Sequence, residues 1–168
     1  MIKRNHMDEL LEEIGSEEYE RIYKALYDLE CLGCLIYRAD RIMVNRLNRA
    51  FQEAGFNITL EQFRVLLHMW EEDGQLQSSL VEQLGKDKGG MARTLDIMEK
   101  KHNLIVRINS KEDKRQRRVY LSNKGKELKT TLAPIAVREN LEYFDMIGPE
   151  NVEIARRILK QLLEKLKS

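Results

Sequence analysis

The sequence predicts a mainly α-helical protein of the α+β class, with one β-hairpin set among its helices. The first observation is that apolar residues recur at close to the helical period of about 3.6 over most of the chain. The second is a change to β-type runs between residues 104 and 121. The third is that the 168 residues include only two prolines, which suits a chain of long helices.

The first element is expected to be one long helix over residues 17–54. Ser16 is placed to cap it, Gly33 marks a bend or a close packing contact, and Gly55 ends it. Residues 1–15 are expected to form a separate short helix or an arm. The helical period is carried by Tyr19, Ile22, Tyr23, Leu26, Leu29, Ile36, Met43, Leu47, Ala50 and Ala54.

Three compact helices are expected next. Thr59 and Gln62 have the spacing of a capping box, and the helix that they open ends at Asp73-Gly74. Its buried stripe is expected to be Leu60, Phe63, Leu66, Leu67 and Trp70.

A short helix over 76–84 follows, with Leu80, Val81 and Leu84 inward and Gly85 at its end. Asp87 then caps a helix over 88–101, which buries Met91, Leu95 and Met98. Two short helices joined by a glycine turn predict a helix-turn-helix.

The period changes after this pair of helices. Residues 104–108 and 118–121 read as two strands, joined by the polar, basic loop 109–117, which makes a hairpin or wing. Residues after Ser122 are helical to about Ile147, and Pro149 starts the last helix. The predicted fold is therefore a winged helix-turn-helix lobe between long N- and C-terminal helices.

This order of elements suggests how the chain divides and assembles. We expect an N-terminal arm and dimerisation helix over 1–56, the winged lobe over 57–121 and C-terminal dimerisation helices over 122–168. The long helices carry more apolar surface than so small a lobe can cover, which favours a symmetric homodimer over packing within one chain. The dimerisation face is expected to include Tyr19, Ile22, Leu26, Ile154, Ile158, Leu162 and Leu166.

The charge of the chain is unevenly distributed. The formal net charge is only +1, but residues 1–30 carry a net −5 and residues 84–126 a net +8. A basic segment in a nearly neutral chain is a candidate for polyanion binding. No apolar run predicts a signal peptide or a membrane span, and two cysteines fit the reducing cytoplasm, where we expect the protein.

Five stretches of the chain form a recognisable series: Thr59-Leu-Glu-Gln-Phe63, Leu84-Gly-Lys-Asp-Lys88, Arg93-Thr-Leu-Asp96, Asp113-Lys-Arg115 and Leu121-Ser-Asn-Lys-Gly125. The most specific part is Asp-x-Arg followed by a strand and a Leu-Ser-x-x-Gly turn. In their order and nearly in their spacing, these stretches resemble the MarR family of winged-helix transcription regulators over about residues 30–166.

The resemblance implies double-stranded DNA as the partner, and the residues agree with it. A helix in the major groove should present small or polar residues at its N-terminal end, where Gly89, Gly90 and Met91 lie. Arg93 matches the arginine that faces DNA in the family. The expected phosphate contacts are Lys86 and Lys88, with backbone and side-chain donors from Gln77, Ser78 and Ser79.

In the wing, Arg115 matches the family arginine that enters the minor groove. Asp113 would orient that arginine by a salt bridge, and Lys114 and Arg117, with Arg118 beside them, would neutralise phosphate. A solvated basic side chain is the plain alternative for each.

Two features depart from the family pattern. Serine or threonine, frequent near Gly89, Gly90 and Ala92, is absent, which predicts thin base readout and greater reliance on DNA shape and on the wing. One residue is inserted near Asn103, which is expected to supply a left-handed helix cap.

Other classes of function remain as alternatives. Cys31-Leu-Gly-Cys34 resembles a redox or metal motif, but the scattered histidines offer no further ligands, so no metal or other cofactor is expected. We expect buried, structural thiols, with a thiol-based redox-sensing regulator as the alternative. No nucleotide-binding or hydrolase motif appears, so an enzyme is not expected. A winged helix that binds protein without DNA is the third reading.

The resemblance also implies a mechanism. A homodimer would act as a repressor on a palindromic operator, with the helix after Asp87 in the major groove and the wing in the minor groove. A phenolic or anionic small molecule, bound between the dimerisation helices and the lobe, would change the spacing of the two recognition helices and release DNA.

Overall fold

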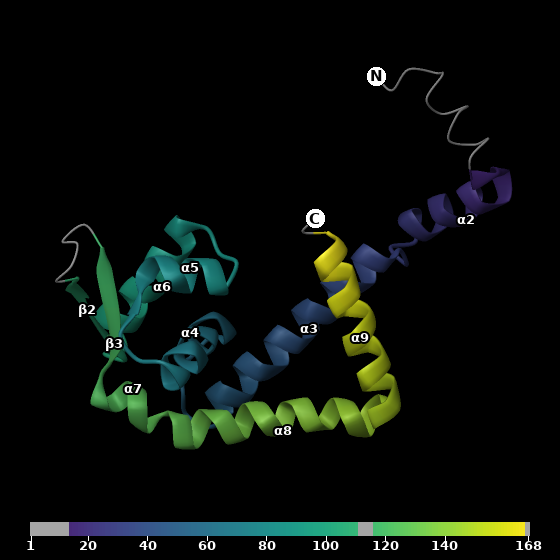
Figure 1. Cartoon of the computed structure of the whole chain (residues 1–168). Coiled ribbons are helices and arrows are strands. Elements are labelled where there is room, and N and C mark those ends of the chain that lie inside the picture. Colours follow the sequence, from purple (N-terminus) through teal and green to yellow (C-terminus); the bar gives the residue numbers. More distant parts are fainter. Residues whose placement is uncertain (1–13, 111–115, 167–168) are drawn as a thin grey trace. The chain divides into compact units, whose positions relative to one another are not determined.

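The computed structural model describes residues 14–110 and 116–166, which form helices and one small antiparallel sheet (Figure 1). The chain divides into two compact units, Met1–Asn45 and Arg46–Ser168, which are described separately. The mainly helical winged-helix class predicted from the sequence is confirmed. The elements are α2 (Ser16–Tyr27), α3 (Leu32–Glu53), α4 (Leu60–Glu71), β1 (Gln75–Leu76), α5 (Gln77–Gln83), α6 (Lys88–Lys100), β2 (Ile105–Asn109), β3 (Arg117–Leu121), α7 (Asn123–Glu127), α8 (Lys129–Ile147) and α9 (Pro149–Lys165).

The first unit corrects the prediction of one helix over residues 17–54. Helix α2 stops at Tyr27 and α3 starts at Leu32. Between them Leu29 takes a left-handed φ of 57°, and the amides of Glu30 and Cys31 donate back to the Ala25 carbonyl, which closes α2. Ser16 is the first residue of α2 and not its cap, because the cap position falls on Gly15. The interruption lies just before Gly33, the expected bend, but no neighbour packs closely against that glycine.

The second unit contains the core. Fully buried side chains come from the end of α3, from α4 to α6, from the sheet and from α8, and include Phe51, Leu66, Leu80, Leu95 and Leu132. The predicted capping box of Thr59 and Gln62 is present. The predicted stripe of α4 is wrong at Leu67, which is 42% exposed, while Val65 and Met69 are buried instead. The core thus extends beyond the winged lobe into both flanking helices.

The sheet has the strand order β1-β3-β2, antiparallel throughout. The hairpin pairs Ile105 with Leu121 and Asn109 with Arg117, close to the predicted strands. Strand β1, which the sequence analysis missed, has two residues and pairs Gln75 with Val119. The buried Gln75 side chain holds this edge in place by donating to the carbonyls of His68 and Glu72, both at 3.0 Å.

The Leu121–Gly125 turn joins the sheet to the C-terminal helices. Ser122 caps α7 by accepting the Gly125 amide at 3.0 Å, and the Trp70 indole donates to the Gly125 carbonyl at 2.9 Å. A Cβ at Gly125 would lie 2.2 Å from the Leu104 carbonyl oxygen. Glycine is therefore required here by a close backbone approach.

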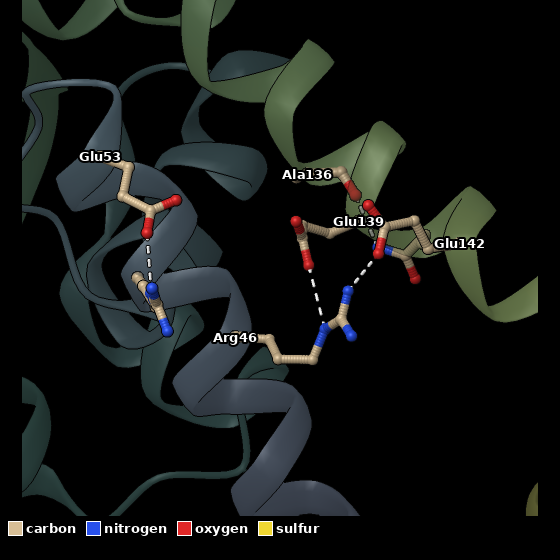
Figure 2. Close-up of polar contacts among 7 residues, drawn as sticks. Arg46, Glu53, Ala136, Glu139 and Glu142 are labelled. Carbon is tan, nitrogen blue, oxygen red and sulfur yellow. Dashed lines mark hydrogen bonds and ion pairs between the residues drawn. The ribbon is translucent and has the colours of Figure 1, made fainter.

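The C-terminal chain forms a short helix and two long ones. A cap at Leu128 separates α7 from α8, and α9 begins at Pro149 as predicted, after Gly148 at φ 83° (Figure 1). Arg46 connects α3 to α8 by an ion pair with Glu142 and by one with Glu139 at 3.3 Å (Figure 2). Within the described residues, no helix is long and apolar enough to cross a membrane.

Candidate nucleic-acid interface

The first turn of α6 is shaped by its capping residue. The Asp87 carboxylate accepts the Gly90 amide at 2.7 Å, and that bond, helped by the Gly89 amide, lowers the pKa of Asp87 from its ordinary value. A Cβ at Gly90 would lie 2.9 Å from this carboxylate, and one at Gly89 would lie 3.2 Å from it. The absence of serine and threonine here therefore has a local cause, because the cap folds over both glycines.

The residues predicted to contact DNA from α6 fall into two groups. Lys88, Gly89 and Arg93 are exposed. Met91 is wrong as a DNA contact, because its side chain is fully buried in the core beside those of Leu95 and Met98. The helical period explains the error, since Met91 lies one turn before Leu95 on the inward face.

A hollow of about 490 Å³ lies against α5, α6 and the sheet. It brings together four residues predicted as phosphate contacts, Gln77 and Ser78 of α5, Lys88 of α6 and Arg117 of β3. Ser79 does not line it. Its other lining residues, Val81, Ala92, Asp96, Arg107 and Gln116, were not among the predicted contacts.

Arg107 is the residue of this site that the sequence analysis missed. Its side chain is only 5% exposed and lies between two carboxylates of α6. It pairs with Asp96, and its Nε and Nη2 lie 3.0 and 2.7 Å from Glu99 Oε2. The backbone amide of Arg107 donates to the same carboxylate at 2.7 Å, so strand β2 is fixed to the recognition helix.

A signal for Arg107 was present in the sequence. Alternation along β2 places Arg107 on the same face as Ile105, which is fully buried. A guanidinium on a buried face needs carboxylate partners. Asp96 and Glu99, three residues apart on one face of α6, are such partners.

Two other basic residues already have protein partners. Lys86, predicted to meet phosphate, lies with its Nζ 2.5 Å from Glu61 of α4. Arg118 donates to the Gly74 carbonyl at 3.0 Å, which supports the edge of the sheet. The wing predictions for Asp113, Lys114 and Arg115 lie outside the described residues. Asn103 has the predicted left-handed conformation, with φ 53°.

The predicted dimerisation residues lie on the surface of the single chain. Ile22 and Leu26 of α2 are 44% and 52% exposed. Ile154, Ile158 and Leu166 of the C-terminal segment are 38%, 50% and 74% exposed. Tyr19 and Leu162 are half-buried.

The alternative site at the cysteines differs from its expectation. Cys31 and Cys34 are free and half-buried, so the prediction of buried thiols is wrong. Cys31 directly precedes α3 and Cys34 lies in its first turn, and both belong to the smaller unit. Among the described residues, no group of three or more His, Cys, Asp or Glu side chains could hold a metal ion.

Comparison with known proteins finds a family model that matches the winged lobe. The model of the MarR family matches residues 58–116, from the start of α4 to the wing. The HTH-type transcriptional regulator MgrA of Staphylococcus aureus is 32% identical over 100 residues, which are 58% of this chain and 65% of MgrA. The chain therefore matches slightly less than two thirds of that relative.

Solved structures extend the likeness to the long helices. A MarR transcriptional regulator from Methanosarcina mazei Go1 is 27% identical, with a TM-score of 0.67 over 81% of this chain and 90% of that one. The transcriptional repressor CouR, bound to a 23-mer DNA duplex, has a TM-score of 0.72 at 24% identity, over 80% and 93%. CouR from Rhodococcus jostii RHA1 is also known bound to p-coumaroyl-CoA, with a TM-score of 0.65 at 20% identity, over 79% and 91%.

The family model covers the helix-turn-helix and the first strand of the wing, and the structural likeness covers the flanking helices as well. MgrA and the Methanosarcina mazei protein are both named as transcription regulators, in agreement with the expectation that the protein is not an enzyme. With the capped recognition helix, the three-stranded sheet and the flanking helices all in place, residues 58–116 match the MarR family model, and the chain has the winged-helix fold of the MarR regulators compared above.

Proposed function

We propose that this chain is a DNA-binding transcription regulator, acting as a homodimeric repressor on a palindromic operator in the cytoplasm. The observation that carries the proposal is the hollow that gathers Gln77, Ser78, Lys88 and Arg117 beside α6. These side chains offer amide, hydroxyl and cationic donors, which are the groups that bind phosphate oxygens. In CouR, the same fold lies on a DNA duplex.

In this proposal α6 enters the major groove. Its first turn carries no side chain at Gly89 or Gly90, so the backbone can approach the base edges closely. Arg93 is exposed about one turn further along and would contact a base edge or a phosphate. Arg115 would reach the minor groove from the wing, with Asp113 orienting it and Lys114 beside it.

Dimerisation would give the operator its symmetry. The exposed apolar residues of α2 and α9 are what a single chain leaves uncovered. Two copies related by a twofold axis would present two recognition helices to half-sites about one helical turn apart, roughly 10–10.5 base pairs.

The proposal is tested on DNA fragments selected from the host genome by the purified chain. Arg93→Ala should weaken binding to the selected site by about 1–3 kcal/mol and reduce its preference over random DNA. Lys88→Ala should weaken binding to both and flatten the salt dependence by about one unit. Arg49→Ala, which removes an exposed arginine paired along α3 with Glu53, is the control and should change neither.

Two outcomes would contradict this assignment. If the parent chain bound no duplex with salt-dependent affinity, the winged helix would be a protein-interaction module. If Arg93→Ala left both the affinity and the preference unchanged, α6 would not read the operator.

An effector site is proposed in the groove between α4 and α8. The groove measures about 330 Å³, and only Asn140 among its lining side chains is polar. The Asn140 amide donates to the Ala136 carbonyl at 2.8 Å, which leaves its oxygen to accept a hydroxyl. The groove thus favours a phenol over an anion. The remaining lining residues are Phe63, Leu67, Ala133, Ala136, Val137, Leu141 and Phe144.

Titration with p-cresol, a neutral phenol, and with benzoate, an anion, tests the groove. p-Cresol should weaken DNA binding by the parent chain, and Val137→Trp, which fills the groove from a 57% exposed position, should abolish that response. A stronger effect of benzoate, or a full response in the filled variant, would place the effector elsewhere.

A further inference from the structure

Both cysteines of the chain lie where α2 meets α3, and both thiols are free. Cys31 directly precedes α3, and Cys34 lies in its first turn. Their Sγ atoms are 2.8 Å apart, and the Cys34 amide donates to Cys31 Sγ at 3.4 Å. The two side chains therefore form a vicinal dithiol, a pair of sulfurs that one ligand atom can bridge.

The backbone holds this pair in place before any ligand arrives. The amides of Glu30 and Cys31 both donate to the Ala25 carbonyl, at 2.7 and 3.0 Å. The Leu35 amide donates to the Cys31 carbonyl at 2.9 Å, so Cys31 is tied to α2 on one side and to α3 on the other. Because the pair is already ordered, a ligand that bridges both sulfurs loses little affinity to the ordering of the chain.

A hollow of about 290 Å³ lies beside the pair and is lined in part by Cys31. Benzene fits in a cavity of about 150 Å³, so this hollow has room for one aromatic ring. Three of its other lining residues are aliphatic, which suits an apolar group. Those lining residues are Arg21, Ile22, Ala25, Glu30 and Leu32.

The two thiols are electrostatically unequal. Hydrogen bonding from the Cys34 thiol and from the Cys34 amide lowers the pKa of Cys31. The contact with Cys31, together with burial, raises the pKa of Cys34. Because the thiolate is the form that binds soft electrophilic atoms, Cys31 is the sulfur that reacts first.

The geometry of the pair selects among thiol-binding ligands. A structural zinc ion takes four ligands, and among the described residues no group of three or more His, Cys, Asp or Glu could hold a metal ion. A linear two-coordinate ion holds its two sulfurs on opposite sides, so it requires sulfurs that are far apart. Trivalent arsenic is soft and pyramidal and binds both sulfurs on one side. In an aryl arsenical its third bond is already made to carbon, so no third protein ligand is needed.

We propose that Cys31 and Cys34 form a chelating site for trivalent aryl arsenicals, with the aryl group in the hollow beside Cys31. Cys31 Sγ bonds to arsenic first, and Cys34 Sγ closes the chelate. Two As–S bonds replace the arsenic–oxygen double bond, and the oxygen leaves with the two thiol protons as one water molecule. Arsenic stays trivalent and both sulfurs stay at the thiol level, so no oxidant or reductant is consumed.

The site is independent of the proposed function, because its occupancy is measured without DNA. The reduced full-length chain is incubated with phenylarsine oxide in an excess of glutathione, a competing monothiol, and is analysed by native mass spectrometry and thiol titration. The parent should bind one phenylarsenic group per chain and lose both thiols together. Dimercaptopropanol, a competing dithiol, should release the group and restore both thiols.

Single serine variants test whether both sulfurs are required. Cys31→Ser and Cys34→Ser each leave one thiol, so the second, intramolecular bond is lost. The affinity for phenylarsine oxide in the presence of glutathione should fall by about 10²-fold or more in each variant. Leu35→Ala, next to Cys34 but outside the lining of the hollow, is the control and should bind like the parent. Circular dichroism checks that α2 and α3 remain helical.

A further variant tests the place given to the aryl group. Ala25→Phe fills the hollow from a half-buried position on α2. It should weaken binding of phenylarsine oxide by about tenfold, because the ring of the ligand loses its apolar contacts. Binding of inorganic arsenite, which has no ring, should be unchanged. An equal loss for both ligands would show that the aryl group does not lie in the hollow.

Three outcomes would overturn the chelating site itself. The first is a parent chain that retains no arsenic against glutathione. The second is an arsenic atom that links two chains instead of two sulfurs of one chain. The third is a serine variant that binds phenylarsine oxide as tightly as the parent.

Discussion

At the scale of single residues, Arg107 fixes the wing to the recognition helix. Its buried guanidinium contacts Asp96 and Glu99, and Asp96 also lines the hollow that contains Lys88 and Arg117. Displacement of β2 relative to α6 would therefore change the spacing of the donors proposed to bind phosphate. Arg107 is a positioning residue with no need to touch DNA itself.

Replacing Arg107 by Met should destabilise the chain by about 2 kcal/mol, measured by urea unfolding. Removing one member of a buried ion cluster leaves its partners uncompensated. The loss stays below that of a fully buried pair because the Asp96 side chain is 48% exposed and can be hydrated. Arg49→Met, at an exposed pair of the same type, should change the free energy of unfolding by less than about 0.5 kcal/mol.

The effect of Arg107→Met on stability is expected to depend on pH. Hydrogen bonding from Arg107 lowers the pKa of Asp96. Burial opposes ionisation of Glu99, but the bonds from Arg107 outweigh it and the pKa of Glu99 is also lowered. Depressed carboxyl pKa values stabilise the fold above the ordinary carboxyl range, and this stabilisation disappears on acidification. The difference between parent and Arg107→Met should thus shrink as the pH falls below about 4. A constant difference would contradict the ion cluster as its cause.

At the scale of elements, the helix break at residues 28–31 shows how a local turn escapes a periodic pattern. The apolar period continues through Leu29, and residues 28–31 contain neither glycine nor proline; the expected marker, Gly33, follows the turn. The chain turns here because Leu29 adopts the left-handed conformation. The backbone amides of Leu29, Glu30 and Cys31 then donate hydrogen bonds to α2, and these bonds offset the cost of that conformation. The helix propensities of the individual residues do not predict a turn that is stabilised in this way.

Strand β1 escaped for a different reason. Two residues are too few to show an alternating pattern, and this strand exists only because β3 offers it an edge. Its stability comes from the buried Gln75 side chain and from Asp73, whose carboxylate accepts the Leu121 amide at 2.8 Å. The contact between Asp73 and Leu121 joins residues far apart in the sequence, and no sequence motif predicts the contact of Gln75 with His68.

At the scale of the whole molecule, the exposed apolar faces of the long helices predict assembly. Ile158→Asp should split the proposed homodimer, because a carboxylate in an apolar interface would be desolvated without a partner. Sedimentation equilibrium at micromolar concentration should show a dimer for the parent and a monomer for the variant. Combining it with Leu162→Asp should extend the effect.

The matched control is Lys160→Asp, which places a carboxylate on the charged face of the same helix. That face includes Glu153, Arg156 and Glu164. The control should remain dimeric. A monomeric parent chain at micromolar concentration would rule out the dimer, and a monomeric control would show that charge alone controls association.

The sequence by itself determined the elements with strong local signals. Thr59 and Asp87 cap helices where their spacing predicted, Met91, Leu95 and Met98 form the buried face of α6, and Asn103 takes the left-handed conformation. Caps, periodicity and turn residues act over a few positions, so a linear pattern contains them. The family resemblance of the helix-turn-helix and wing followed from the same local motifs and is confirmed.

Only the tertiary structure decided which side chains meet. It paired Lys86 with Glu61, placed Arg107 between two acids and brought the thiols of Cys31 and Cys34 together through a turn. Each outcome depends on how elements pack or how a turn closes, and burial or pairing changes the chemistry of a side chain more than its identity does. Residue types in the sequence indicated the candidate functional residues, and the packing of the elements determined which of them are exposed and which are paired.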